Sequence, residues 1–266
     1  MLQTDEVLAL YDDEMRRDPV PGPGSRVERV GRIVRVVGKD NCVLFSDLSE
    51  ADAEEVVAAQ AEFFRESGAE VEWKVFGHDR PPNLEAVLAS EGFAPDEPET
   101  LVVFDLRAGV PGEIATAGVE VRWVMDDVGV RDAVIARDAA FGPEAPDSSA
   151  RYARMLKDPN QALFVAYVEG KPVASARIEM TPGRSFASLW GGGTAPEYRH
   201  RGIYRSLVHA RAILAASKGY RFLTVDARET SRPILERLGF VPLTTTRGWV
   251  LRPRPGDSAE VKSKPP

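Results

Sequence analysis

The stretch GGGTAPEYRHRGIYR, residues 191–205, decides the fold. It brings a run of glycines, a proline, several arginines and a further glycine, Gly202, close together in the chain. We interpret it as the end of a strand, a turn whose backbone binds an anion, and the start of a helix. The first turn of a helix leaves N–H groups without partners and carries partial positive charge. Gly202 lets the backbone approach a bulky anion, and the basic side chains nearby would strengthen the field: Arg199, His200, Arg201 and Arg205.

The flanking sequence supports this order of strand, turn and helix. Residues 185–193 are predicted as a strand and residues 201–217 as a helix. The helix has an apolar stripe of Ile203, Leu207, Ala210 and Leu214, with Arg201, Arg205 and Arg211 largely off it. Two common phosphate loops are excluded. No Gly-Lys-Ser/Thr follows, as a Walker loop requires, and the glycine spacing differs from that of the dinucleotide fingerprint.

Strands and helices are predicted on both sides of this pair. After residue 118 we expect strands at 119–124, 222–227 and 249–252, helices at 127–141 and 148–157, two strands within 162–180 around a Glu169-Gly170 turn, and a short helix that begins near Ser231 and Pro233. Before residue 107 we expect helices at 2–17 and 83–91, a helix that is capped by the pair Ser49 and Asp52 and runs to about residue 67, and strands at 32–37, 42–48, 71–76 and 101–106.

The segment RAGVPGEIATAG, residues 107–118, is predicted to be a linker because it is rich in Gly, Ala and Pro. We therefore expect an N-terminal domain over 1–106 and a C-terminal domain over 119–252. The tail over 253–266 is rich in Pro, Ser and charge, which is typical of disorder.

The two halves share a weak internal similarity. NLEAVLASEGF (83–93) and RPILERLGF (232–240) each follow a strand and place Gly-Phe after a short helix. Gly is the usual helix terminator, so the match also has an ordinary explanation. The order of elements around it favours a structural repeat. The first half has no counterpart of residues 194–205, so such a repeat would lack the anion-binding turn.

Composition limits the partners and the location. The net charge is −7 and the pI is near 5.2, which argues against a nucleic-acid partner and is compatible with a cationic acceptor such as an amine. No apolar run approaches the roughly 18–20 residues that span a bilayer, so we expect no membrane partner.

The first residues lack the features of a secretory signal, and Cys42 is the only cysteine. We therefore expect a cytoplasmic protein. Without clustered His or Cys, a metal site has no support. The oligomeric state is left open.

The order APEYRHRGIY resembles the acyl-CoA signature of the GNAT superfamily of N-acetyltransferases. That signature is Arg or Gln, two residues, Gly, one residue, then Gly or Ala, and Arg199, Gly202 and Tyr204 stand at these positions. LWGGGTAPEY looks like the fourth strand of the family and its exit, and RPILERLGF looks like its later helix. The resemblance covers about residues 119–252. It implies an α+β fold, a mixed sheet flanked by helices, with two tandem GNAT-like domains of which the first lacks the CoA-binding motif.

The resemblance also implies a binding site for acetyl-CoA. The parallel strands at 186–194 and 221–227 would splay apart, the pantetheine arm would enter between them, and the pyrophosphate would lie on the N–H groups of residues 200–205. Glycines in the first strand fit, because a strand without side chains leaves room for a ligand; a bulge is the alternative explanation. The implied cofactor-binding residues are Gly192, Gly193, Thr194, Ala195, Arg199, His200, Arg201, Gly202, Ile203, Tyr204 and Arg205.

Some positions depart from the family. Tyr204 stands where Gly or Ala is usual, and we favour core packing over a place lining the cofactor channel. The tyrosine that protonates the thiolate in many members falls on Leu235, and the usual asparagine falls near Arg228. Water or another group would then supply the proton, or the substrate site is built differently, or the domain binds acyl-CoA as a sensor or regulatory module without turnover.

The predicted reaction is transfer of the acetyl group to a primary amine of a small molecule or peptide by direct attack. It needs an amine that has lost its proton, an N–H group for the developing oxyanion and a proton for the thiolate. The candidate bases are Asp226 and Glu179. Asp226 ends a strand beside the splay, where a solvated strand end or a cap would also explain it. Glu179 shares a strand face with Arg177, and an ion pair would explain both.

Overall fold

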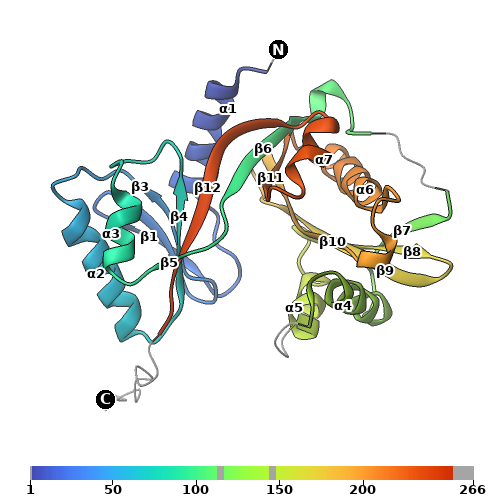
Figure 1. The fold of residues 1–266 in the computed structure, drawn as a ribbon, viewed down its shortest axis with the longest axis horizontal. Coiled ribbons are helices and arrows are strands. Elements are labelled where there is room, and N and C mark those ends of the chain that lie inside the picture. The colour runs from blue at the N-terminus through green and yellow to red at the C-terminus, as the bar shows by residue number, and fades with distance from the viewer. Residues whose placement is uncertain (1, 113–116, 144–147, 254–266) are drawn as a thin grey trace. The chain divides into compact units, whose positions relative to one another are not determined.

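The computed structural model describes residues 2–112, 117–143 and 148–253 (Figure 1). These residues form two units. One comprises Gln3–Leu101 and the strand that continues beyond Pro242, and the other comprises Val102–Pro242. The predicted tail falls outside the described residues except for its first residue, and residues 113–116 of the predicted linker also fall outside them.

The C-terminal unit is built on a mixed sheet with strand order β6-β11-β10-β9-β8-β7. β10 and β11 are parallel, whereas β7, β8, β9 and β10 form antiparallel pairs in sequence order. The strands are β7 (Val119–Trp123), β8 (Gln161–Val168), β9 (Lys171–Met180), β10 (Phe186–Thr194) and β11 (Phe222–Ala227), with the end of β6 (Glu99–Asp105).

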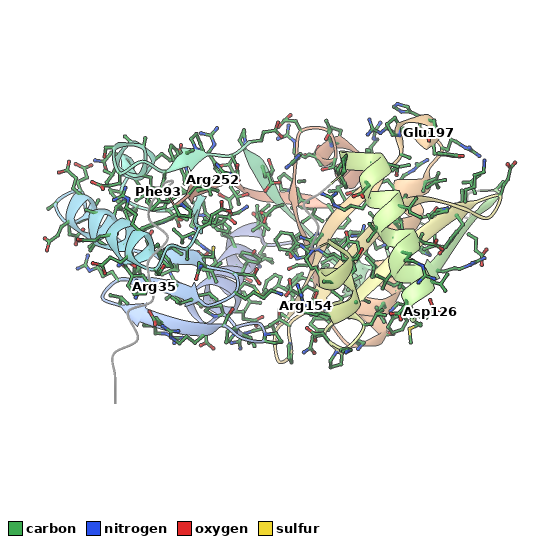
Figure 2. The ribbon with its side chains drawn as sticks, turned by 90° about the horizontal axis from the view of Figure 1, so that it is seen from below. Arg35, Phe93, Asp126, Arg154, Glu197 and Arg252 are labelled. Carbon is green, nitrogen blue, oxygen red and sulfur yellow. The ribbon has the colours of Figure 1, made fainter. Side chains whose placement is uncertain are left out.

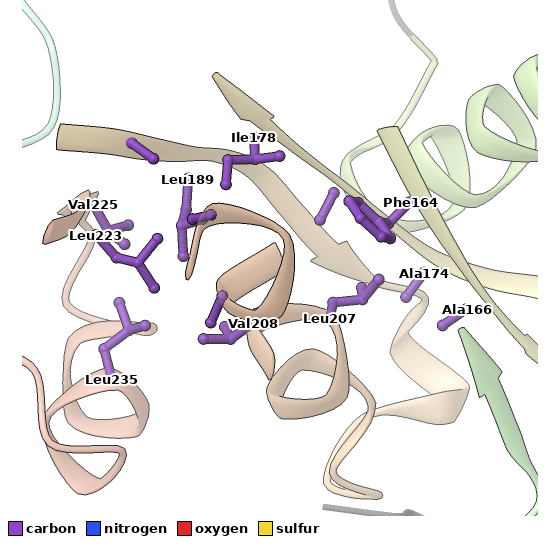
Figure 3. Packing of buried hydrophobic residues seen from close by; sticks show 14 of the residues in the cluster. Phe164, Ala166, Ala174, Ile178, Leu189, Leu207, Val208, Leu223, Val225 and Leu235 are labelled. Atoms are coloured by element: carbon purple, nitrogen blue, oxygen red, sulfur yellow. The ribbon is translucent and has the colours of Figure 1, made fainter. Parts of the chain in front are cut away.

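Helices cover both faces of this sheet. They are α4 (Asp127–Phe141), α5 (Ser148–Met155), α6 (Ile203–Ser217) and α7 (Arg232–Arg237), with short 3-10 turns at Leu106–Ala108 and Pro196–Tyr198. Alternate strand residues pack under α6 and α7 in one apolar cluster (Figure 3), and the residues between them pack under α4 and α5 in another. Figure 2 shows α4 lying across the sheet from Asp126, whose carboxylate accepts the Gly129 N–H at its start.

The sequence of the β8–β9 hairpin accounts for its position in the middle of the sheet. QALFVAYV is apolar almost throughout, and all of β8 after Gln161 is buried, as expected of a strand covered on both faces. The predicted turn residues Glu169 and Gly170 both adopt positive φ, 49° and 75°. A two-residue hairpin turn requires this conformation, so the predicted hairpin is confirmed.

The N-terminal unit has the strand order β1-β2-β3-β4-β12, with β5 also paired to β12. β3 and β4 are parallel, and β4 and β12 are antiparallel. Its elements are α1 (Thr4–Tyr11), a π-helical segment (Asp12–Arg17), β1 (Arg26–Val30), β2 (Ile33–Val37), β3 (Cys42–Ser46), α2 (Ala53–Glu66), β4 (Val71–Phe76), α3 (Leu84–Ser90), β5 (Ala94–Pro95) and β12 (Val241–Leu251). One apolar cluster packs between this sheet and α2 and α3.

Each half of the chain gives its last strand to the unit built by the other half. β6 ends the N-terminal half, yet its second part belongs to the C-terminal unit, where Val102 lies in the core cluster and Phe104 packs on Phe240 with ring centroids 5.4 Å apart. β12 ends the C-terminal half, yet residues 246–251 pair with 71–76 of β4. The units therefore divide the chain within β6 and within β12, and the division into 1–106 and 119–252 stays a prediction.

Most predicted elements are confirmed with ends shifted by a few residues, and the strands at 71–76 and 222–227 match in full. The predicted strand at 249–252 is only the end of β12, which begins at Val241. The sequence analysis missed β1 and the short β5. β1 reads RVERV and is mostly exposed, so no buried face marked it as a strand.

Candidate acyl-CoA site

The two parallel strands of the C-terminal unit separate at one end. β10 and β11 pair from Phe186 and Phe222 as far as Ser188 and Thr224, where the parallel register ends. β10 continues to Thr194, still paired on its other edge with β9, and β11 continues to Ala227. One edge of β10 is thus released from the sheet beyond Ser188. We call this region the splay.

The released edge offers a backbone amide at Thr194. The next amide, that of Ala195, donates to the Val173 carbonyl on β9 at 2.9 Å. Because successive residues of a strand direct their amides to opposite edges, the Thr194 amide points into the splay. The Ala195 carbonyl accepts the Tyr198 N–H at 2.9 Å, so both backbone groups of Ala195 already have partners in the protein.

The turn after β10 presents a series of N–H groups. The Arg199 amide donates to the Pro196 carbonyl, and the Ser206 amide donates to the Gly202 carbonyl. Between them, the amides of residues 200–205 donate to no group among the described residues. His200 and Gly202 both have positive φ, 62° and 80°, and Gly202 precedes the first helical residue, Ile203. Alternating left-handed residues turn consecutive amides toward one side, which makes an anion-binding concavity at the helix start.

The basic side chains around the turn do not all face this concavity. Arg199 donates to the Thr194 carbonyl at 3.1 Å and to the Ala140 carbonyl at 3.3 Å, so it fastens the turn to α4. Arg201 stacks over Tyr198, with its guanidinium carbon 5.6 Å from the ring centroid. His200 and Arg205 are exposed. The predicted cofactor-binding residues therefore lie together at one end of β10, where they present backbone groups. The Arg199 side chain stabilises the turn instead of facing the concavity.

Both explanations of the β10 glycines, a β-bulge and the need for space free of side chains, agree with the structure. The register shifts between Trp190 and Gly193, so the bulge is present. A methyl group on Gly192 would stand 2.8 Å from Tyr204 Cε2, and one on Gly193 would overlap the Phe141 ring. Side chains at these positions would thus collide with α6 and α4. Tyr204 packs against the core cluster, as favoured, and its ring also forms the floor of the splay beneath Gly192.

Arg211 is the residue near this site that the sequence analysis missed. It is 1% exposed on α6, where its Nε donates to the Leu207 carbonyl at 2.9 Å and its Nη1 donates to the Arg177 carbonyl at 3.0 Å. Its Nη2 would be 3.5 Å from a methyl group on Gly192. Burial lowers the pKa of Arg211 to about 10. The sequence analysis did not predict that Arg211 is buried, because it lies off the predicted apolar stripe and arginine is usually exposed. Its neighbours in the sequence, Val208, Ala212 and Ala215, are all buried and could have indicated this.

The two candidate bases lie on the sheet face away from α6. Leu223, Val225 and Ala227 point into the cluster under α6 and α7, so Thr224 and Asp226 point the other way. The Thr224 hydroxyl lies 3.1 Å from the Ser188 hydroxyl, and Ser188 is paired with Glu179. Asp226 and Glu179 therefore share one face, on strands about 10 Å apart across two strand spacings.

Two residues of β9 and β10 complete this face beside the splay. Trp190, which is 37% exposed, is paired with Arg177, whose guanidinium carbon lies 5.5 Å from the indole centroid. The face thus combines carboxylates, hydroxyls, a guanidinium and an aromatic ring, groups that suit a polar or cationic acceptor.

At two positions where many members of the GNAT superfamily have a functional tyrosine or asparagine, this chain has a different residue. Leu235 on α7 is 0% exposed and lies in the core cluster (Figure 3), so it contributes packing and no proton. Arg228 follows the end of β11 and is exposed.

In the N-terminal unit, a side chain of the protein occupies the space between the corresponding parallel strands, β3 and β4. β3 and β4 pair in parallel only at Cys42–Glu72 and Val43–Trp73. Beyond that point Arg16, 1% exposed, donates from Nε to the Leu44 carbonyl at 3.0 Å and stacks on Phe76, its guanidinium carbon 3.8 Å from the ring centroid.

Acidic groups surround Arg16 and the start of the following helix. The Arg16 guanidinium also donates to Asp12 and, with both oxygens accepting, to Asp79, each at 2.7 Å. At the start of α2, the Asp52 carboxylate accepts the Ser49 amide and hydroxyl, and Glu54 and Glu55 follow in the first turn. A phosphate would meet negative charge there.

Comparison with known proteins agrees with this geometry. Residues 133–240 match the sequence profile described as the Acetyltransferase (GNAT) family. No curated protein matches the sequence. Within the described residues, no helix is long and apolar enough to cross a membrane.

Several solved structures share the fold over nearly the whole chain. A GCN5-related N-acetyltransferase from Kribbella flavida has 17% sequence identity and a TM-score of 0.65, with 94% of this chain and 96% of that chain covered. One from Sphaerobacter thermophilus has 15% identity and a TM-score of 0.62, with 95% and 86% covered. A tandem GNAT protein from the clavulanic acid biosynthesis pathway has 14% identity and a TM-score of 0.58, with 94% and 95% covered. The predicted fold, a mixed sheet flanked by helices in two tandem GNAT-like domains, is confirmed.

Proposed function

Since the C-terminal half of the chain belongs to the acetyltransferase (GNAT) family through residues 133–240, we propose that this acyltransferase is an N-acetyltransferase that uses acetyl-CoA. The acetyl group passes to a primary amine of a small molecule or peptide by direct attack. The family supports acyl transfer; the donor, the amine acceptor and a cytoplasmic location are part of the proposal.

The observation that carries the proposal is the alignment of the splay with the turn before α6. A narrow arm can pair with the edge of β10 that ends its parallel pairing at Ser188. The diphosphate at the other end of that arm then meets the amides of residues 200–205, which have no acceptor among the described residues. Amides at a helix start bind anionic oxygens well, because they are fixed in place and add to the helix dipole.

The residues of the site then have distinct roles. Thr194 offers its amide to the pantetheine arm, Gly192 and Gly193 keep the strand clear of side chains, and Ala195 and Arg199 hold the turn. His200, Arg201, Gly202, Ile203, Tyr204 and Arg205 supply backbone amides for the diphosphate. Holding the thioester and the amine in line accounts for much of the rate in such a site.

The acceptor amine approaches from the sheet face that carries Asp226 and Glu179. Asp226 stands at the end of β11, where the strands have separated, so it is our candidate for removing the proton of the amine. Glu179 and Arg177 lie farther from the opening and contribute to the charge of the pocket. The acidic character of this face, with the net charge of −7, suits a cationic acceptor.

The N-terminal unit is proposed as a structural partner that binds no CoA. Arg16 fills the space that the splay leaves open in the C-terminal unit, and carboxylates stand at the start of α2. The amides at the start of α2 lie beside the carboxylates of Asp52, Glu54 and Glu55, which disfavour a bound anion.

A second candidate is a sensor that binds acyl-CoA without turning it over, and the burial of Leu235 at the usual tyrosine position favours it. Purified protein with acetyl-CoA and a panel of amines separates the two. We expect release of free thiol that depends on the amine, together with binding of acetyl-CoA by calorimetry. Binding without release across the panel would support the sensor, and absence of binding would refute both.

A further inference from the structure

Two aromatic side chains beside the splay are exposed, and the proposed function has given neither of them a role. Trp190 on β10 is 37% exposed, and Phe141 at the end of α4 is 54% exposed. Single exposed apolar side chains are common on protein surfaces, but exposed apolar side chains that gather at one place often mark a binding surface. The position of these two relative to the candidate base indicates what they bind.

Trp190 and Asp226 face each other across the splay. The parallel register pairs Ser188 of β10 with Thr224 of β11, and two residues farther along each strand are Trp190 and Asp226, which are therefore level. Both point away from α6, as Ser188 and Thr224 do, because residues two apart in a strand share a face. Neighbouring strands lie about 5 Å apart, and these two are no longer paired here. The indole and the carboxylate thus stand on opposite sides of the opening.

Phe141 reaches the same face from α4. A methyl group on Gly193 would overlap the Phe141 ring, so this ring lies on the backbone of β10 at that residue. Along β9, the partner of Gly193 is two residues from the partner of Trp190. Two residues of a strand span about 7 Å, a separation comparable to the width of one aromatic ring. Trp190 and Phe141 therefore border the same part of the face.

The charged groups of this face favour an acceptor with a single positive charge. Asp226 and Glu179 are acidic, and Arg177 is basic, with its guanidinium carbon 5.5 Å from the Trp190 indole centroid. Two carboxylates and one guanidinium leave one negative charge in excess. An amine with one ammonium group complements this excess, whereas a polyamine would also meet Arg177.

We propose that Trp190 and Phe141 select the acceptor, and that the acceptor is a primary amine with one positive charge and an aromatic ring about two carbons from the nitrogen. This inference rests on the proposed function, which leaves the amine open. The ring lies against Trp190 and Phe141, and the amino group reaches Asp226 across the opening. A chain of two carbons suits the spacing of about 5 Å between neighbouring strands. Aromatic rings gain from offset or edge contacts with one another, so a flat ring binds better here than a saturated ring of similar size.

The first test compares amines that differ in one feature, with acetyl-CoA as donor. We expect kcat/KM for 2-phenylethylamine to exceed that for 2-cyclohexylethylamine by about three- to tenfold, the gain typical of an aromatic contact. n-Butylamine lacks the ring and spermidine carries several charges, so both should be poorer than 2-phenylethylamine by about tenfold or more. An equal or higher kcat/KM for 2-cyclohexylethylamine or for spermidine would overturn the inference.

The second test removes the rings. Trp190→Leu and Phe141→Leu keep an apolar side chain, and each should reduce the preference for 2-phenylethylamine over n-butylamine by about three- to tenfold, mainly through KM. The matched control is Trp123→Leu. Trp123 is also an exposed tryptophan, 45%, but it stacks on Phe164 in β7 and β8, away from β10, and should leave the preference unchanged. If Phe141→Leu does not fold, Trp190→Leu decides the question.

A binding measurement separates this inference from the proposed function. Calorimetry of 2-phenylethylamine with saturating CoA needs no turnover, and Trp190→Leu should weaken this binding by about three- to tenfold. That loss of affinity, without thiol release for any amine, would refute the transfer reaction and support the aromatic site. Turnover of amines with an unchanged preference in Trp190→Leu would overturn the aromatic site alone. Neither turnover nor binding of 2-phenylethylamine would overturn both.

Discussion

The ring of Tyr204 lies so close to the backbone of Gly192 that a methyl group on the glycine would be 2.8 Å from Cε2. The floor of the candidate site and its strand edge are thus in direct contact, and each fixes the position of the other. A strand residue with a side chain at this position would displace the ring, the strand or both.

Gly192→Ala should therefore destabilise the protein by about 1–3 kcal/mol, the usual cost of overpacking, and weaken acetyl-CoA binding. Chemical denaturation and calorimetry measure the two effects. Gly22→Ala is the control, because nothing lies within 4 Å of the added methyl group. Combining Gly192→Ala with Tyr204→Ala should cost less than the sum of the single changes; strict additivity would contradict the contact.

The open amides at the start of α6 predict a charge effect at Gly202. Its φ of 80° is left-handed, a conformation that Asn and Asp tolerate better than other substituents. Gly202→Asp and Gly202→Asn are nearly equal in size and differ in charge. We expect Gly202→Asp to bind acetyl-CoA at least tenfold more weakly than Gly202→Asn, since a carboxylate would compete for the amides that receive the diphosphate. Equal affinities by calorimetry would place the diphosphate elsewhere.

Asp226 is predicted to act on the acceptor and not on the donor. Asp226→Asn should lower kcat by about 10²-fold or more, as the loss of a general base does, while the affinity for acetyl-CoA stays unchanged. Glu179→Gln, on the same face two strands away, should have a smaller effect on kcat. Steady-state kinetics with a fixed amine, together with calorimetry, make the comparison. If Glu179→Gln were the more damaging change, the two roles would be reversed.

Arg16 is predicted to stabilise the N-terminal unit. Arg16→Met leaves Asp12 and Asp79 buried without their cation, and removing one partner of a buried pair costs about 3–5 kcal/mol. The neighbouring Arg17 pairs with Asp13 at 2.6 Å on the surface, so Arg17→Met should cost less than about 1 kcal/mol. Denaturant titration of both variants tests the difference. Similar losses would show that Arg16 contributes no more than a surface ion pair.

The same cluster predicts a loss of stability in acid. Burial acts to raise the pKa of Asp12, but hydrogen bonds from His78 and Arg16 and the Arg16 charge leave it below its ordinary value of 3.8. A carboxyl with a lowered pKa stabilises the fold above its ordinary pKa, and this stabilisation disappears as the pH falls through the lowered value. Asp12→Asn should therefore flatten the decline of unfolding free energy below about pH 4. An unchanged decline would assign acid sensitivity to other groups.

The local signals in the sequence predicted local structure well. The Glu169-Gly170 turn, the strand at 222–227 and the helix after Gly202 depend on neighbours in the chain, and each is confirmed. The splay was expected from the family resemblance, and the pairing of β10 and β11 ends where the ligand would enter.

What the sequence did not reveal depends on partners far away in the chain. Arg16 and Arg211 look like surface residues, since arginine is rarely buried, and their burial follows from carbonyls and rings on other elements. The first part of β12 reads VPLTTT, where Pro242 and the threonines give little apolar pattern. It pairs with β4, which lies about 170 residues earlier in the chain. The hydrophobic periodicity of a segment does not indicate such a distant partner.

Because β6 completes the sheet of the C-terminal unit and β12 completes that of the N-terminal unit, we expect that neither half of the chain folds properly without the other. A fragment that began at the predicted linker would leave β11 with an unoccupied edge, and a fragment that ended there would leave β4 in the same state. Such edges recruit strands from other molecules. Separated halves would therefore aggregate, or associate with each other when mixed, because each half needs a strand from the other to complete its sheet.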